Sequence, residues 1–68
     1  MTNQINIVVD TLIKYDNKNN LSWMKVYKET LKGLNIPDTN ELLLNVVKEI
    51  TKRGYDITDT PFKLEKFK

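Results

Sequence analysis

The chain of 68 residues has no cysteine and no histidine. Disulfide bonds, metal sites with thiolate or imidazole ligands, and catalytic pairs that need Cys or His are therefore excluded. The nine acidic residues are spread along the chain, so we expect no carboxylate cage for a hard cation. Two glycines are too few for a loop that cradles phosphate. We expect a protein that is not an enzyme and that has no metal and no cofactor.

Long hydrophobic runs are also missing. The longest is three residues, whereas a membrane-spanning helix needs about 20. The N-terminus has no basic residues before its first apolar stretch and no small-residue cleavage site after it, unlike a signal peptide. We expect a cytoplasmic protein with no membrane contact. Its length allows one small domain, residues 1–68, with a correspondingly limited core.

The charge balance is mildly basic, with eleven basic and nine acidic residues and a net charge of +2. A dedicated nucleic-acid-binding domain usually carries more positive charge. Eight Asn, ten Lys and six Ile accompany one Arg and no Ala, a usage typical of translation from an AT-rich genome. We therefore expect a low-GC bacterium, phage or plasmid as the source, and we do not read the preference for Lys over Arg as a functional signal.

The N-terminal stretch 2–16 has the apolar spacing of an amphipathic helix. Thr2 or Asn3 is a suitable N-cap, and a polar segment ends the helix. A second helix begins after Ser22 and ends at Gly33, because glycine is common at helix C-termini. The residues expected to face the core from these two helices are Ile5, Val8, Val9, Leu12, Ile13, Trp23, Val26, Tyr27, Leu31 and Leu34.

A third helix is predicted up to Gly54. Asp38 is a good N-cap, and Glu41 follows three residues later, as in a capping box. The residues at helical spacing, expected on the core face, are Leu43, Val47 and Ile50. We expect Leu12, Trp23, Val47 and Ile50 to be largely buried, because they lie at the centres of the three stripes.

The C-terminal tail allows two structures. Tyr55–Thr58 is suited to an extended strand, residues 59–61 to a turn, and Phe62–Phe67 to a returning strand. Thr60 and Pro61 are also a suitable N-cap and first residue for a short fourth helix, which would give an all-α bundle. We favour the hairpin. The expected fold class is therefore α+β, mostly α, with a three-helix core and a C-terminal β-hairpin.

Two sets of residues resemble the winged helix-turn-helix family. The front half is Ile5-x-x-Val8-Val9-x-x-Leu12-Ile13 followed by Leu21-Ser22, and the back half is Leu43, Val47, Ile50, Gly54, Tyr55 and Ile57. The helix-turn-helix corner departs from the family pattern. Tyr27 stands where the family usually has a small residue, and Gly33 comes later in the sequence than the glycine of the family's turn. The resemblance implies a small DNA-associated regulatory or accessory protein. The alternative is a protein-interaction module of the same fold that does not bind DNA.

The second helix carries a row of lysines, Lys25, Lys28 and Lys32, within about 60° of one another. Such a row can contact the phosphates of double-stranded DNA. The alternative is a solvated face that keeps a small protein soluble.

The third helix is where a winged helix would read bases. The outward candidates are Thr39, Asn40, Asn45, Lys48 and Lys52; Asn45 suits adenine, and Lys48 suits guanine or phosphate. Asp38 and Glu41 place negative charge at the same end, which suits the helix dipole but repels phosphates. We therefore expect any DNA binding to be weakly sequence-specific, and an ordinary capped helix is the alternative.

Two aliphatic residues are expected to lie outside the core, Ile7 and Leu44. Exposed on so small a protein, they suit a protein partner or a homodimer; the alternative is that they are isolated or covered by the tail. Tyr15, Trp23 and Tyr27 have the chemistry of a base-stacking platform. Because a small domain needs aromatic bulk inside, we expect Trp23 and Tyr27 to pack in the core.

Overall fold

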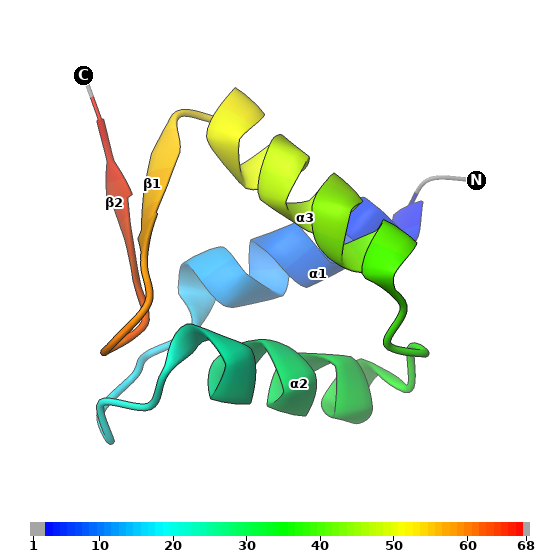
Figure 1. Cartoon of the computed structure of the whole chain (residues 1–68), viewed down its shortest axis with the longest axis horizontal. Helices are drawn as coiled ribbons and strands as arrows, with labels where there is room; N and C mark the ends of the chain where they lie inside the picture. Colours follow the sequence, from blue (N-terminus) through cyan, green and yellow to red (C-terminus); the bar gives the residue numbers. More distant parts are fainter. Residues whose placement is uncertain (1–2, 68) are drawn as a thin grey trace.

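The computed structural model describes residues 3–67, which form three helices followed by a two-stranded antiparallel hairpin (Figure 1). The elements are α1 (Asn3–Lys14), α2 (Trp23–Leu34), α3 (Asn40–Lys52), β1 (Tyr55–Thr58) and β2 (Lys63–Lys66). The expected class, α+β and mostly α with a C-terminal hairpin, is confirmed. The alternative of a short fourth helix is wrong, because the tail pairs with β1 instead.

Helix α1 is the central element of the helical layer. It packs against both α2 and α3, and these two contact each other less closely. The fully buried residues are mostly aliphatic and come from all three helices: Val8, Val9, Leu12, Val26, Tyr27, Leu31, Val46 and Ile50. The apolar stripes predicted for α1 and α2 therefore meet in one core, as expected from their helical period.

The core face of α3 differs from the prediction. Leu42, Val46 and Ile50 are buried, whereas Leu43 and Val47 are half-buried at the edge of the core. Val47 is therefore less completely buried than Leu12, Trp23 and Ile50, for which the predicted burial is confirmed. Because Leu42, Leu43 and Leu44 are consecutive, the helix can turn either Leu42 or Leu43 toward the core.

The rotation adopted places Arg53 next to α1. Its guanidinium donates to Asp10 at 2.6 Å, to Glu49 at 2.9 Å and to Asn6 at 3.2 Å. These contacts need one flank of α3 to face α1, which turns Leu42 and Val46 inward.

Two helix ends also differ from the prediction. Helix α2 ends at Asn35, which adopts the left-handed region at φ 59°, while Gly33 lies inside the helix. Asparagine adopts this conformation more readily than most other residues with a side chain, although less readily than glycine. Helix α3 is capped by Thr39 and not by Asp38, because the Thr39 hydroxyl accepts a hydrogen bond from the Leu42 N–H at 3.1 Å. Thr2, one of the two caps expected for α1, lies outside the described residues.

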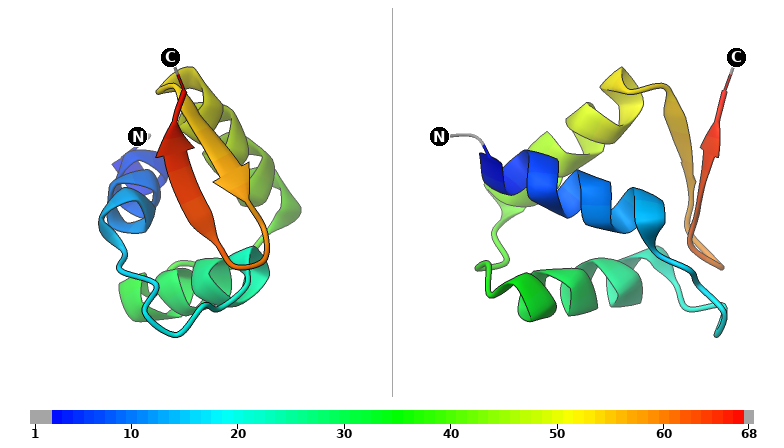
Figure 2. Two further views of the ribbon diagram at one scale, coloured as in Figure 1. Left: turned by 90° about the vertical axis from the view of Figure 1, so that its left-hand side faces the viewer. Right: turned by 180° about the vertical axis from the view of Figure 1, so that it is seen from behind.

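The hairpin covers one end of the helical layer (Figure 2). Gly54 adopts a φ of +86°, a backbone conformation that residues with a side chain rarely adopt, and the chain leaves α3 at this point. In the register of the two strands, Ile57 pairs with Leu64 and both contact the core, while Asp56 pairs with Glu65 and both are exposed. Phe62, immediately before β2, is buried among the helices.

The loop before α2 is held by one side chain, Asn17. Its amide Nδ2 donates to the carbonyls of Leu21 at 2.9 Å and Phe62 at 3.1 Å, and its Oδ1 accepts from the Leu21 N–H at 2.9 Å. Asn17 thus ties the connection between α1 and α2 to the hairpin, which the sequence gives no pattern to anticipate.

Candidate interaction surface

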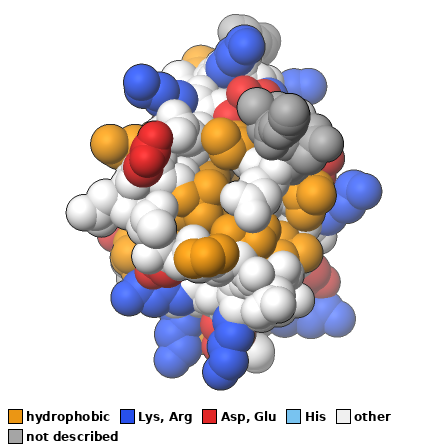
Figure 3. Space-filling model, turned by 90° about the vertical axis from the view of Figure 1, so that its right-hand side faces the viewer, with side chains coloured by type: hydrophobic (Ala, Val, Ile, Leu, Met, Phe, Trp, Pro, Cys, Tyr) orange, Lys and Arg blue, Asp and Glu red, His pale blue; other side chains and the backbone are white. Residues whose placement is uncertain are grey.

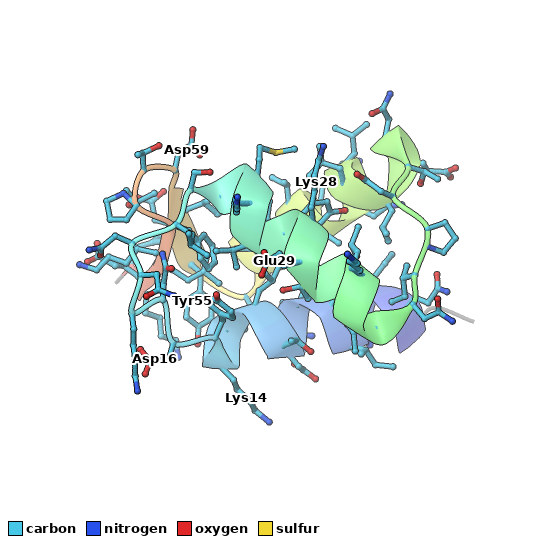
Figure 4. The ribbon with its side chains drawn as sticks, turned by 90° about the horizontal axis from the view of Figure 1, so that it is seen from below. Lys14, Asp16, Lys28, Glu29, Tyr55 and Asp59 are labelled. Atoms are coloured by element: carbon cyan, nitrogen blue, oxygen red, sulfur yellow. The ribbon has the colours of Figure 1, made fainter. Side chains whose placement is uncertain are left out.

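The lysine row of α2 lies on the outward face of that helix. Lys25, Lys28 and Lys32 are exposed, as is Glu29 beside them. Figure 4 looks onto α2 from outside and shows Lys28 on the side of α2 nearer to α3. The three lysines are therefore exposed on one side of α2, as predicted, although Glu29 reduces the net positive charge there.

The exposed face of α3 carries a second group of predicted residues. Glu41, Leu44, Lys48 and Lys52 are all exposed, and their spacing places them along one side of the helix. Leu44 has 63% of its surface exposed, more than any other large hydrophobic residue in the part of the chain described. The charges are ordered along the helix, because acidic groups precede Leu44 and basic groups follow it.

The predicted base-reading residues of α3 are less available than expected. The hydroxyl of Thr39 is engaged in capping the helix. Asn45, predicted to point outward, is half-buried, because the rotation that buries Leu42 and Val46 also draws Asn45 toward the core. Asn45 is therefore less exposed than predicted. Asn40, Lys48 and Lys52 keep exposed side chains.

The hairpin presents acidic and already paired groups to solvent. Asp56 and Glu65 lie directly opposite each other on its exposed face. Like charges in this position repel each other and also repel phosphates. Lys63 pairs with Glu65 at 3.4 Å, and the ammonium of Lys66 lies 5.8 Å from the centre of the Tyr55 ring. Residues 55–67 carry three acidic side chains and two lysines, so the hairpin adds no net positive charge to that of α2.

Arg53 is a structural residue. Its hydrogen bonds to Asp10 and then to Glu49 raise the pKa of the guanidinium above its ordinary value. The spacing of Glu49 and Arg53, four residues apart on one helix, is the sequence signal that could have suggested this role. Because its donors are committed to α1 and α3, Arg53 is not a phosphate-binding candidate.

The aromatic residues of α2 pack inside, as expected. The rings of Trp23 and Tyr27 lie 5.1 Å apart, and Tyr27 is completely buried. Burial, with a smaller effect from the charge of Asp38, raises the pKa of Tyr27 to about 12. Its hydroxyl finds no hydrogen-bond partner among the described residues. Trp23 and Tyr27 therefore form no base-stacking platform.

Exposed hydrophobic side chains occur on several elements. The exposure predicted for Ile7 and Leu44 is confirmed, and Ile7 lies on the outward face of a different helix, α1. Met24 and Phe67 are also exposed, which the sequence analysis missed. Met24 lies outside the predicted core stripe of α2, which is the signal that could have revealed its exposure, whereas Phe67 follows the last strand and has no periodic signal.

The end of the molecule that contains the connection between α2 and α3 has a mixed surface (Figure 3). Hydrophobic side chains gather in the middle of this face, and Lys and Arg side chains lie along its lower and upper edges. A shallow hollow here is lined in part by Leu31, Ile36 and Pro37. The positive groups on this face therefore do not form one continuous surface.

Comparisons with family models, with curated proteins and with solved structures give no match for this chain. Within residues 3–67, no helix is long and apolar enough to cross a membrane. The same residues contain no group of three or more acidic side chains close enough to hold a metal ion.

Proposed function

We propose that this chain is a protein-interaction module with a regulatory or accessory role, and that its docking surface is the exposed face of α3. The observation that carries the proposal is the exposure of Leu44 at the middle of a face with charges at both ends. Burial of apolar surface favours association, because it removes that surface from water. A central hydrophobic residue with a polar and charged rim is the usual anatomy of a protein interface.

The chemistry of the same face argues against base reading. Glu41 repels phosphates, Thr39 is engaged as a cap, and Asn45 is half-buried. A leucine at the centre of the face gives a DNA groove little to bind except a thymine methyl group. These features support a protein partner over DNA as the ligand of α3.

The experiment is a comparison of immobilised wild type with two variants in a lysate of the source organism. Leu44→Asp places a charge on the proposed surface, and Ile7→Asp makes the same change at an exposed position on α1. We expect a protein that is retained by wild type and by Ile7→Asp and is lost with Leu44→Asp. Identical retention by all three proteins would contradict the proposal.

A second candidate is weak association with double-stranded DNA. The observation that favours it is the row of three exposed lysines on α2, which can contact phosphates without reading sequence. This candidate uses a different helix from the protein-docking surface. Substitutions on α2 and on α3 therefore distinguish the two functions.

A further inference from the structure

We propose that the partner of the α3 face is a second copy of this chain, bound antiparallel about a two-fold axis that passes close to Leu44. The inference rests on the proposed function, because it identifies the occupant of the same surface. It is carried by the order of exposed charges along α3 and by the exposed leucine between them.

The charges are divided into two halves. Asp38 and Glu41 precede Leu44, and Lys48 and Lys52 follow it; all four charged residues are exposed. At a rise of about 1.5 Å per residue, the exposed face from residue 41 to residue 52 extends about 16 Å. The surface is thus a short bar that is negative at one end, apolar near its centre and positive at the other end.

Two copies of this α3 face are complementary in charge only when the two helices run antiparallel. In an antiparallel pair centred near Leu44, Glu41 of each copy lies opposite Lys48 of the other, and Lys52 lies near Asp38. A parallel pair would instead place Glu41 against Glu41 and Lys48 against Lys48, which repel. A two-fold axis repeats every contact, so the antiparallel pair has two copies of each favourable ion pair.

The centre of the pair is apolar and unobstructed. The two Leu44 side chains meet near the axis, where each removes the other from water. The neighbouring exposed positions on this side of α3, Asn40 and Thr51, carry short polar side chains that allow two helices to approach. One helix face is smaller than a standard interface, so we expect a weak dimer with a dissociation constant between about 1 µM and 1 mM.

The experiment is sedimentation equilibrium of the full chain between about 20 µM and 2 mM, which overlaps the expected range of dissociation constants. Glu41→Lys and Lys48→Glu each turn both ion pairs into repulsions, and we expect each variant alone to associate at least about tenfold more weakly than wild type. Mixed in equal amounts, the two variants restore both attractions, because position 41 of each variant then faces the opposite charge at position 48 of the other. We expect the mixture to dimerise at least as well as wild type.

A matched control separates this face from general electrostatics. Lys25→Glu makes the same charge change as Lys48→Glu but lies on α2, and we expect it to dimerise like wild type. A monomeric wild type, a monomeric mixture, or equal effects of Lys25→Glu and Lys48→Glu would each overturn the inference. Recovery in the mixture also shows that both variants fold, since an unfolded chain cannot restore the dimer.

The two proposals can fail separately. A monomeric wild type overturns the assignment of a second copy whatever the lysate experiment gives. Retention of another protein that depends on Leu44 would then still support the docking surface with a different partner.

Discussion

The ring of Trp23 lies 5.4 Å from the ring of Phe62, centroid to centroid, at an angle of 37° between their planes. Trp23 is the first residue of α2, and Phe62 immediately precedes β2, so this contact joins the helical layer to the hairpin. Two backbone hydrogen bonds of 2.8 Å flank it, from the Trp23 N–H to the Asp59 carbonyl and from the Phe62 N–H to the Leu21 carbonyl. The hairpin is therefore part of the same cooperative core as the helices.

Replacing Trp23 with Ala should destabilise the whole fold. The substitution deletes contacts with both Tyr27 and Phe62, and loss of a buried aromatic side chain typically costs about 3–5 kcal/mol. A domain with a stability of roughly 5 kcal/mol would then be at the edge of folding. Met24→Ala, at the exposed neighbouring position, is the control and should change stability by less than about 0.5 kcal/mol. Thermal unfolding measures both, and similar melting temperatures would contradict the role of Trp23.

Asn17→Ala should also be costly, although the side chain is small and only half-buried. Its removal leaves the Leu21 N–H and the Phe62 carbonyl without their hydrogen-bond partner, and the Leu21 carbonyl keeps only the bond from the Phe62 N–H. Leaving such groups unsatisfied costs about 1–3 kcal/mol in total when water can partly replace the lost bonds. Asn19→Ala, in the same loop but exposed, should be nearly neutral. Urea unfolding of the two variants provides the comparison, and equal midpoints would show that Asn17 does not hold the loop.

The pH dependence of stability should report on Tyr27. Its pKa is about 12 in the folded chain and 10.0 in the unfolded chain, so the unfolded state loses the proton first. The stabilisation is fully present below pH 10 and is lost as the pH rises through 12, up to about 3 kcal/mol. Tyr27→Phe should remove this dependence.

The same variant tests the buried hydroxyl at neutral pH. Because that hydroxyl has no partner among the described residues, Tyr27→Phe should be neutral or slightly stabilising at pH 7. Denaturant unfolding at pH 7 and above pH 10 measures both effects. A clear loss of stability at pH 7 would show that the hydroxyl is hydrogen-bonded in solution.

The lysine row of α2 limits how steeply the affinity for duplex DNA can depend on salt concentration. Three phosphate contacts give a slope of log affinity against log salt of about −2.7, at about −0.9 for each contact. Changing Lys28 and Lys32 to Ala should reduce the slope by about two, whereas Lys48→Ala should leave it unchanged. Titrations with duplex DNA from about 50 mM salt upward measure the slopes. A steeper slope, or an effect of Lys48→Ala, would assign DNA binding to α3 and contradict its role in protein docking.

Much of the fold follows from local patterns. The apolar stripes of α1 and α2 and the break at Gly54 predict the helices. The extended patterns of Tyr55–Thr58 and Phe62–Phe67 favour the hairpin but also allow a short fourth helix. The rotation of α3 was not predictable from its own sequence, because Leu42, Leu43 and Leu44 satisfy more than one core face. A tertiary contact, between Arg53 and Asp10, distinguishes these rotations.

The candidate site was predictable to a similar extent. The exposure of Lys25, Lys48 and Leu44 follows from their helical positions relative to the core. The partial burial of Asn45 and the engagement of Thr39 depend on the rotation of α3 and on the exact residue at which it begins. Neither is encoded by spacing alone, and both bear on the choice between base reading and protein docking.

The most direct test of the central claim, that the exposed face of α3 is a protein-binding surface with a second copy as its partner, is a dilution series followed by amide NMR. Between about 1 mM and 20 µM, which overlaps the expected range of dissociation constants, the signals of Glu41, Leu44 and Lys48 should shift together, and those of Lys25 and Lys32 on α2 should not. Leu44→Asp should abolish these shifts. Signals of α3 that do not change with concentration, or changes confined to another face, would contradict the account.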